Sequence, residues 1–311
     1  MLGKKDKILI AGARGMVGSA LVECFRSEGC QELLTPSHAE LDYTDQQAVR
    51  NYLAIHKPDV VVISAAKVGG IWANMTYPAE FIYTNLMIGT NLIHESHRVG
   101  IQRLLYLGST CIYPREAPQP ICEDALLTGP LEKTNEAYAL AKIAGIKMCQ
   151  FYRAQYGRSY ISAMPTNLYG PNDNYHPENS HVIPGLLRRF HEAKMQAAPS
   201  VKIWGTGKAC REFLYVDDLA KAVHHLLGHY DDPSPINIGS LEEVTIRQLA
   251  EHIAQTVGYS GEITHDLSKP DGTPRKKTDI ARILALGWKP TISLTEGLNR
   301  TYQDFSNALN L

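Results

Sequence analysis

Short hydrophobic runs alternate with segments of helical periodicity along the first 170 residues. Mainly aliphatic runs at residues 8–11, 33–34, 60–64, 104–107 and 160–164 are typical of buried strands. Between them, helices are predicted at 17–27, 46–56, 79–97 and 135–156, and Pro78 and Gly100 flank the third. This alternation predicts an α/β fold built on a doubly wound, parallel sheet of the Rossmann type.

The pattern changes after Gly170. Loops rich in Pro, Asn, Asp and His, with scattered helices, replace the regular alternation. We therefore expect residues 1–170 to form a dinucleotide-binding domain, with room for later segments to return to it. Residues 171–311 are expected to form mainly a smaller, C-terminal substrate-binding lobe. Within it, the segment 269–277 is rich in Pro, Gly and charge and is predicted to be an exposed loop.

Charge and composition narrow the class of protein. The chain has 31 Lys and Arg against 32 Asp and Glu, so no broad positive surface is expected for nucleic acid or an anionic membrane. No hydrophobic run approaches the ~18 residues of a membrane-spanning helix, and a short basic lead runs directly into the first strand. The six cysteines include no CxxC pair, so no metal site is expected. These features favour a soluble, cytoplasmic protein that binds a small molecule.

A glycine-rich turn follows the first predicted strand and opens the first predicted helix. It consists of Gly12, Ala13, Arg14, Gly15, Met16, Val17 and Gly18. Glycines let backbone amides approach a pyrophosphate, which the positive end of the helix then stabilises. The turn therefore predicts a dinucleotide site, and a plain strand-to-helix turn is the alternative.

The residues around this turn favour NADP(H) over NAD(H). An NAD site usually has an acidic residue after the second strand, where it binds the ribose 2′-hydroxyl. This chain has Thr-Pro-Ser-His at 35–38 instead. Arg14 is a candidate partner for a 2′-phosphate, because a guanidinium binds phosphate through a planar pair of hydrogen bonds. A solvated loop charge is the alternative for Arg14.

Three further residues suggest a site for proton transfer. Ser109 follows the fourth predicted strand, at the edge where parallel sheets bind ligands. Tyr138 and Lys142 are four residues apart on a predicted helix, so both side chains lie on one face. We expect the ammonium to lower the pKa of the phenol and to make Tyr138 a usable proton donor or acceptor. An ordinary half-buried helix face is the alternative.

These residues together resemble the extended short-chain dehydrogenases. Within that group the chain is similar to the GDP-L-fucose synthases over nearly its whole length. The resemblance rests on five motifs in order: AKVGGI at 66–71, STCIYP at 109–114, PTNLYGP at 165–171, NSHVIP at 179–184 and KPDGTPRK at 269–276. One departure is that Ser37 and His38 stand where the family often has an arginine for the 2′-phosphate.

The resemblance implies an activity and a set of site residues. Such enzymes convert GDP-4-keto-6-deoxy-D-mannose to GDP-L-fucose by two epimerisations beside the ketone and reduction with NADPH. By resemblance, Cys111 and His181 exchange protons during epimerisation, while Tyr138, Lys142 and Ser109 serve reduction. The cofactor set extends to Leu107, Gly108, Lys142, Pro165, Thr166, Asn167, Leu168 and His181. The substrate set is Arg189, Trp204, Arg211 and Asp271. A homodimer, formed by the helices at 79–97 and 135–156, is also implied.

Structural explanations stay open for several of these residues. Cys111 is also explained as a small buried residue at a strand end, and His181 as a polar group beside a helix cap formed by Asn179 or Ser180. Each of the four substrate residues has an ordinary structural explanation as well. Another nucleotide-sugar epimerase or reductase on the same scaffold, and a non-catalytic NADP-binding regulatory protein, are the alternative functions.

Overall fold

The computed structural model describes residues 2–269 and 271–309 and is built around one parallel sheet. Its six strands lie in the order β10-β5-β4-β3-β1-β2, and every neighbouring pair is parallel. The strands are β1 (Lys7–Ala11), β2 (Glu32–Leu34), β3 (Val60–Ile63), β4 (Arg103–Leu107), β5 (Ser159–Pro165) and β10 (Ile236–Ile238). The order reverses direction at β1, where such sheets bind ligands. The predicted doubly wound α/β fold is confirmed.

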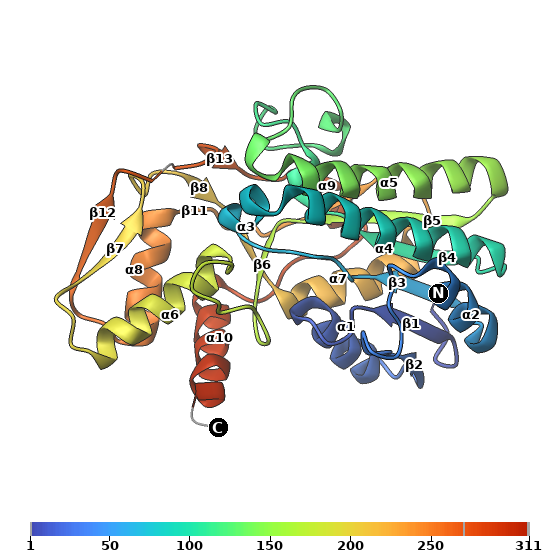
Figure 1. Ribbon diagram of the computed structural model, residues 1–311, viewed down its shortest axis with the longest axis horizontal. Helices are drawn as coiled ribbons and strands as arrows, with labels where there is room; N and C mark the ends of the chain where they lie inside the picture. The colour runs from blue at the N-terminus through green and yellow to red at the C-terminus, as the bar shows by residue number, and fades with distance from the viewer. Residues whose placement is uncertain (1, 270, 310–311) are drawn as a thin grey trace.

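Helices cover both faces of this sheet because successive strand residues point to opposite sides. Ile8 and Ile10 belong to the hydrophobic core on one face, and Leu9 and Ala11 to the core on the other. The first core is closed by α1 (Met16–Ser27), α7 (Val216–His229) and α9 (Ala281–Ala285). The second is closed by α2 (Gln46–His56), α4 (Pro78–Arg98) and α5 (Glu136–Tyr156), as Figure 1 shows. Between β3 and α4 lies the short helix α3 (Ile71–Thr76).

A smaller lobe with its own hydrophobic core lies beside the sheet (Figure 1). It contains α6 (Val182–Met195), α8 (Ile246–Val257) and α10 (Leu294–Leu309), with a parallel pair formed by β7 (Ser200–Trp204) and β12 (Glu262–Asp266). Short strands connect the lobes: β6 (Asn167–Tyr169) pairs with β9 (Phe213–Tyr215), and β8 (Cys210–Arg211) lies between β11 (Val244–Thr245) and β13 (Arg275–Lys276). Single 3-10 turns lie at η1 (Thr110–Ile112), η2 (Glu123–Ala125) and η3 (Lys133–Asn135).

The second half of the chain contains more regular structure than the expected loops and scattered helices, and part of it returns to the larger lobe, as the predicted domain boundary allowed. Helix α7 packs on α1, and β10 extends the central sheet beside β5, so both return to the larger lobe. The segment 269–277 is not an exposed loop throughout, because Arg275–Lys276 forms β13 and pairs with β8. Strands of two or three residues, one of them entirely basic, are too short to produce a hydrophobic pattern.

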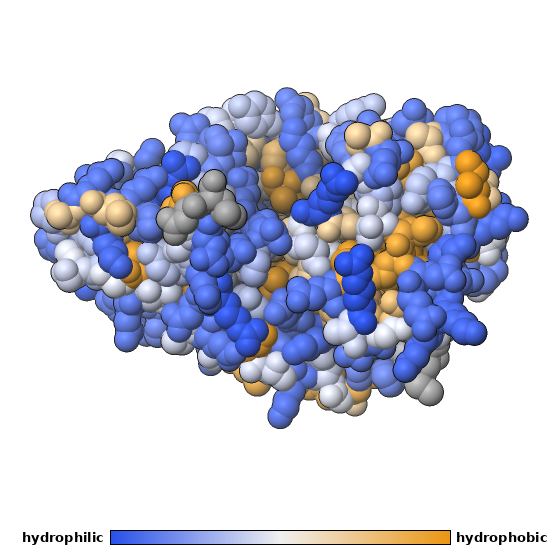
Figure 2. Space-filling view, turned by 90° about the horizontal axis from the view of Figure 1, so that it is seen from below, coloured by the Kyte–Doolittle hydropathy of each residue, from blue (hydrophilic) through white to orange (hydrophobic). Residues whose placement is uncertain are grey.

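Polar side chains cover most of the face that Figure 2 shows, and the hydrophobic areas on it lie mainly over the larger lobe. Within the described residues, no helix combines the length and the apolar character needed to cross a membrane.

Candidate active site

The glycine turn lies at the carboxyl end of β1, where steric contacts require glycine at two positions. Gly12 has a φ of 89°, and a Cβ there would lie 2.7 Å from the backbone nitrogen of Ala65. A Cβ on Gly18 would lie 1.9 Å from the carbonyl oxygen of Gly12. At Gly15 the nearest such atom is 3.7 Å away, so there is room for a ligand. Helix α1 begins there with no side-chain cap and no acidic residue in its first turn, which leaves its amides available to a pyrophosphate.

The loop after β2 determines which groups can meet the ribose end of a dinucleotide. Both the backbone N–H and the hydroxyl of Ser37 donate to the carboxylate of Glu40, at 2.7 and 2.6 Å. These hydrogen bonds, with a smaller contribution from the charge of Arg14, hold the pKa of Glu40 below its usual value. Ser37 is therefore already engaged, whereas Arg14 and His38 are exposed.

The predicted reduction residues lie together at the carboxyl end of β4. The Lys142 ammonium is buried, donates to the carbonyl oxygen of Leu107 at 2.7 Å and lies 5.8 Å from the centre of the Tyr138 ring. Ser109 caps the turn η1, its hydroxyl oxygen accepting the N–H of Cys111 at 3.3 Å. The four-residue spacing on α5 thus turns Tyr138 and Lys142 toward the end of β4.

The electrostatics of this pair differ from the expectation that Lys142 lowers the pKa of Tyr138. Burial raises the pKa of Tyr138 above its ordinary value, the charge of Cys111 adds to the rise, and a hydrogen bond with Ser109 opposes it. Burial also lowers the pKa of Lys142 to about 7. Removing both groups from water therefore outweighs their mutual effect. The phenol stays protonated at neutral pH, as a proton donor to a developing alkoxide requires.

Cys111 lies among cationic groups from the second half of the chain. Its sulfur is 3.6 Å from the Nζ of Lys276 on β13. It is also close enough to Arg211 on β8 for their charges to interact, although burial is the main cause that lowers the pKa of Arg211. Cys111, Tyr138 and Arg211 are therefore brought to one place from three distant segments.

His181 belongs to the smaller lobe and lies at its boundary with the larger lobe. It is the N-cap residue of α6, so Asn179 and Ser180 do not cap that helix as the structural alternative assumed, and its ring makes no capping hydrogen bond. His181 is an exposed residue, and desolvation by the surrounding protein lowers the pKa of its imidazole. The Gly70 N–H donates to the carbonyl of Asn179, and a Cβ on Gly70 would lie 2.5 Å from the carbonyl oxygen of Ser180. This backbone contact holds the His181 segment against the larger lobe.

The remaining predicted cofactor residues lie at the ends of β4 and β5, which are neighbours in the sheet. Leu107 ends β4, and the N–H of Gly108 donates to the carbonyl of Ala163 at 2.8 Å. Pro165 ends β5, and Asn167 and Leu168 begin the crossing to the smaller lobe in β6. Thr166 is buried between them, and its hydroxyl has no hydrogen-bond partner among the described residues. An unsatisfied buried hydroxyl at this edge fits a site that a ligand completes.

Two of the predicted substrate residues, Arg211 and Asp271, lie near each other in the fold. A Cβ on Gly272, next to Asp271, would lie 3.4 Å from the guanidinium of Arg211. The Asp271 carboxylate accepts from the N–H and hydroxyl of Thr206 at 2.6 and 2.9 Å, just after Trp204 in the chain. Asp271 is thus a turn-stabilising residue in this structure, with its carboxylate engaged.

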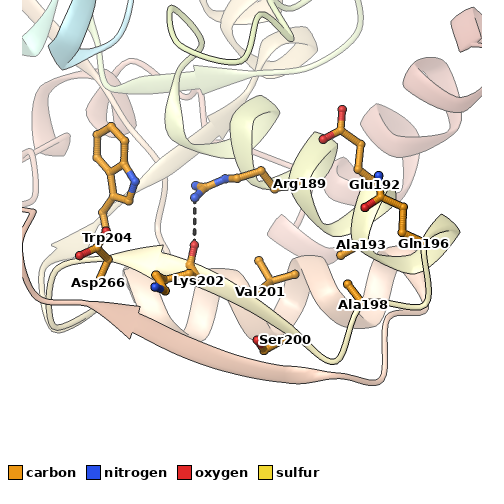
Figure 3. Close-up of a pocket in the computed structure, with 10 residues that line it drawn as sticks. All are labelled: Arg189, Glu192, Ala193, Gln196, Ala198, Ser200, Val201, Lys202, Trp204 and Asp266. Carbon is orange, nitrogen blue, oxygen red and sulfur yellow. Dashed lines mark hydrogen bonds between the residues drawn. The ribbon is translucent and has the colours of Figure 1, made fainter.

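Arg189 and Trp204 line one pocket of about 400 Å³ between α6 and β7. Figure 3 shows the guanidinium of Arg189 pointing toward Trp204, held by a 3.0 Å hydrogen bond to the carbonyl of Lys202. Burial lowers the pKa of Arg189, and no carboxylate pairs with it among the described residues. The pocket has a volume typical of small-molecule sites and offers both a cation and an aromatic face.

Sequence reasoning missed Lys276, the cation beside Cys111, and Glu212, which binds the residues that follow it. Lys276 belonged to a recognised motif but was not identified as a site residue. Glu212, which is fully buried, accepts the N–H of Thr278 at 2.8 Å and pairs with Lys277 at 3.2 Å. The run of basic residues at 275–277 was the sequence signal that could have identified Lys276, but such a charged run usually lies on the solvated surface.

Comparisons with known proteins identify the family. Residues 8–239 match the model of the NAD dependent epimerase/dehydratase family. A GDP-L-fucose synthase 1 from Arabidopsis thaliana is 57% identical over 302 residues, which cover 97% of this chain and 94% of that protein. A GDP-L-fucose synthase from Escherichia coli (strain K12) is 54% identical over 310 residues, 97% of each.

Solved structures show the same relationship. The crystal structure of a GDP-L-fucose synthetase from Naegleria fowleri bound to NADP is similar with a TM-score of 0.91 at 27% identity, covering 100% of this chain and 97% of that one. The chain therefore belongs to the NAD dependent epimerase/dehydratase family and, within it, to the GDP-L-fucose synthases.

Proposed function

We propose that the protein converts GDP-4-keto-6-deoxy-D-mannose to GDP-L-fucose, through epimerisation of both carbons beside the ketone and reduction of that ketone with NADPH. The observation that carries the proposal is the cluster of Ser109, Cys111, Tyr138 and Lys142 at the end of β4. The cluster combines a proton donor for an alkoxide with a thiol that can exchange protons with carbon. The activities of the similar plant and bacterial proteins support the same substrate.

In the reduction, bound NADPH supplies the hydride to the ketone carbon. Tyr138 donates its proton to the ketone oxygen as negative charge develops there. Ser109 donates a second hydrogen bond to that oxygen, and Lys142 provides positive charge behind the phenol. The glycine turn fits this cofactor because Gly15 leaves space and α1 leaves its first amides unpaired.

In the epimerisations, the ketone makes the hydrogens on both neighbouring carbons acidic. Cys111, as thiolate, removes such a proton, and the electrons of the C–H bond pass to the ketone oxygen. His181 returns a proton to the same carbon from the opposite face, which inverts it. The lowered pKa of His181 makes its charged form a stronger acid.

We infer that the smaller lobe binds the nucleotide. Arg211, next to Cys111, is positioned to meet the diphosphate, and the pocket of Arg189 and Trp204 accepts the nucleoside. Two half-buried guanidinium groups without carboxylate partners among the described residues favour an anionic ligand. Asp271 supports Thr206 in the turn between these sites.

We infer that NADP(H) is selected mainly by Arg14, together with His38. Arg14 in the turn after β1 and His38 in the loop after β2 are both exposed, and Ser37 is engaged by Glu40. A single arginine still distinguishes the two cofactors, because only NADP(H) has a 2′-phosphate to pair with it.

We also infer a homodimer located in the cytoplasm. Helices α4 and α5 contact each other and expose large hydrophobic side chains: Tyr83 (62%), Leu140 (44%), Phe151 (65%) and Tyr156 (47%). Such a shared surface suits a two-fold interface between copies. The six cysteines form no disulfide, as expected in a reducing compartment. Light scattering of the purified protein at the mass of one chain would contradict the dimer.

The substrate is tested by the loss of NADPH absorbance. Purified protein should oxidise NADPH when given GDP-4-keto-6-deoxy-D-mannose, and the product should be GDP-L-fucose by chromatography against a standard. UDP-linked 4-keto sugars are the matched control and should give little oxidation. Oxidation with the UDP sugars and none with the GDP sugar would reject the proposal.

A further inference from the structure

Arg275 and Lys276 form strand β13, and Lys277 follows them, so three basic residues are consecutive. The middle residue, Lys276, differs from the other two in its contacts. Arg275 pairs with Glu243 at the surface, at 2.8 Å, and Lys277 pairs with buried Glu212, at 3.2 Å. Lys276 has no ion pair with a carboxylate among residues 2–269 and 271–309. Its ammonium lies 3.6 Å from the sulfur of Cys111 instead.

We propose that Lys276 is a positioning residue that holds Cys111 as a thiolate, directed at the sugar. This inference rests on the proposed epimerase function, because it assigns a partner to the thiol of that step. The ammonium stabilises the negative sulfur before proton transfer. When the sulfur takes the proton from carbon, the negative charge moves to the ketone oxygen. Lys276 keeps its own proton throughout.

The fold fixes the ammonium beside the sulfur. Strand β13 pairs in parallel with β8, which places Lys276 opposite Arg211. The next residue, Lys277, receives a hydrogen bond from the N–H of Ile121 at 2.7 Å and donates its own N–H to Gln119 at 2.9 Å. Because Gln119 and Ile121 belong to the loop that follows Cys111, β13 is tied directly to the segment that carries the thiol.

The other charged and titratable groups facing Cys111 do not take the place of Lys276 in stabilising its thiolate. Tyr138 on α5 is a neutral phenol at neutral pH, because burial raises its pKa. Arg211 on β8 is cationic, but its guanidinium donates to the carbonyl of Cys210 at 2.7 Å. Lys276 is the cation whose hydrogen bond goes to the sulfur itself.

The test is the alkylation of Cys111 by iodoacetamide as a function of pH, followed by mass spectrometry of its peptide. It needs no substrate. With Lys276→Met, we expect the midpoint pH of alkylation to rise by about one unit and the rate at pH 7 to fall about tenfold, since a nearby opposite charge shifts ionisation by roughly 1–3 units. Lys276→Arg should retain most of the wild-type reactivity because it restores the positive charge.

Two internal controls separate this effect from general damage. Arg275→Gln removes the neighbouring surface cation and should leave Cys111 alkylation unchanged. Exposed Cys122 should react equally in every variant. An unchanged midpoint for Cys111 in Lys276→Met would overturn the proposal, as would an equal shift in Arg275→Gln.

A second measurement separates this proposal from the proposed function. With the GDP-linked ketone, Lys276→Met should lower kcat for solvent deuterium entry beside the ketone and leave KM near the wild-type value. A raised KM with unchanged alkylation would make Lys276 a substrate contact only, which overturns the proposal. If wild-type protein exchanges no deuterium but the alkylation shift is present, the proposed function fails and the Lys276–Cys111 pair stands.

Discussion

The residues proposed for reduction and those proposed for epimerisation are positioned in different ways. Tyr138 and Lys142 project from one long helix against the end of one buried strand, all within the larger lobe. Cys111 lies on a turn, Lys276 on a two-residue strand and His181 at a helix start in the smaller lobe. The first group is therefore placed by regular secondary structure, and the second by contacts between distant segments.

This difference suggests that the two chemistries can be lost separately. Local changes on α5 should impair reduction while proton exchange with carbon continues. Changes in β13, or in the segment before α6, should impair exchange while the reduction residues stay in place. Four predictions, from the largest expected effect to the smallest, examine this separation.

Tyr138→Phe should give the largest effect. It removes the proton donor for the alkoxide and should lower the rate of NADPH oxidation by about 10²–10⁴-fold. Solvent deuterium should still enter the sugar beside the ketone, because Cys111 and His181 are unaltered. Mass spectrometry of recovered nucleotide sugar measures this exchange. Loss of both activities together would show that the two groups of residues are not independent.

Cys111→Ser should have the opposite effect. A hydroxyl ionises far less readily than a thiol, so deuterium entry should fall by about 10²-fold or more. Binding of NADPH, followed by fluorescence, should be unchanged and serves as the control. Deuterium entry at the wild-type rate would remove Cys111 from the epimerisation.

Lys142 should make the stability of the ligand-free protein depend on pH. Its pKa is about 7 in the folded protein, against 10.5 ordinarily, so the unfolded chain binds more protons between these pH values. The free energy of unfolding should therefore rise with pH in this window, by up to about 1.4 kcal/mol per pH unit. Lys142→Met should lack this component in urea unfolding measured from pH 7 to 10. Parallel curves for the two proteins would contradict a buried, poorly solvated ammonium.

Arg14→Gln should have the smallest effect and should leave both groups of catalytic residues intact. Loss of one charged hydrogen bond to a 2′-phosphate should weaken NADPH binding about tenfold. Binding of NADH should barely change, which makes it the control within the same titration. Equal weakening of both cofactors would assign Arg14 to the pyrophosphate instead.

The first half of the fold was predictable because its elements are long and hydrophobic. The helix predicted at 46–56 is α2 with the same bounds, and Pro78 begins α4 as expected. The sequence analysis left room for later segments to return to the larger lobe, but β10 itself was not among the predicted strands. A three-residue strand carries too little hydrophobic pattern, and its place beside β5 depends on tertiary packing.

The site residues were likewise predictable where their placement depends on local structure. The spacing of Tyr138 and Lys142 was sufficient to place both side chains at the end of β4, because helical geometry is local. The direction of the pKa change at Tyr138 was wrong, since burial by distant residues dominates it. Cys111 and His181 entered only through resemblance to a family. No local rule connects either residue to Lys276 or to Gly70, because those contacts arise from chain segments that meet only in the folded protein.

Because of the contact between Gly70 and Ser180, a residue without a reactive side chain should be as sensitive to substitution as a residue that takes part in the reaction. A single methyl group at residue 70 would lie 2.5 Å from the Ser180 carbonyl oxygen, so one of the two backbones would have to move. His181 follows directly in the chain and would move with it. In the proposed epimerisation, a glycine that takes no part in proton transfer would thereby position the histidine that returns the proton, and its replacement should have the same effect as loss of that histidine.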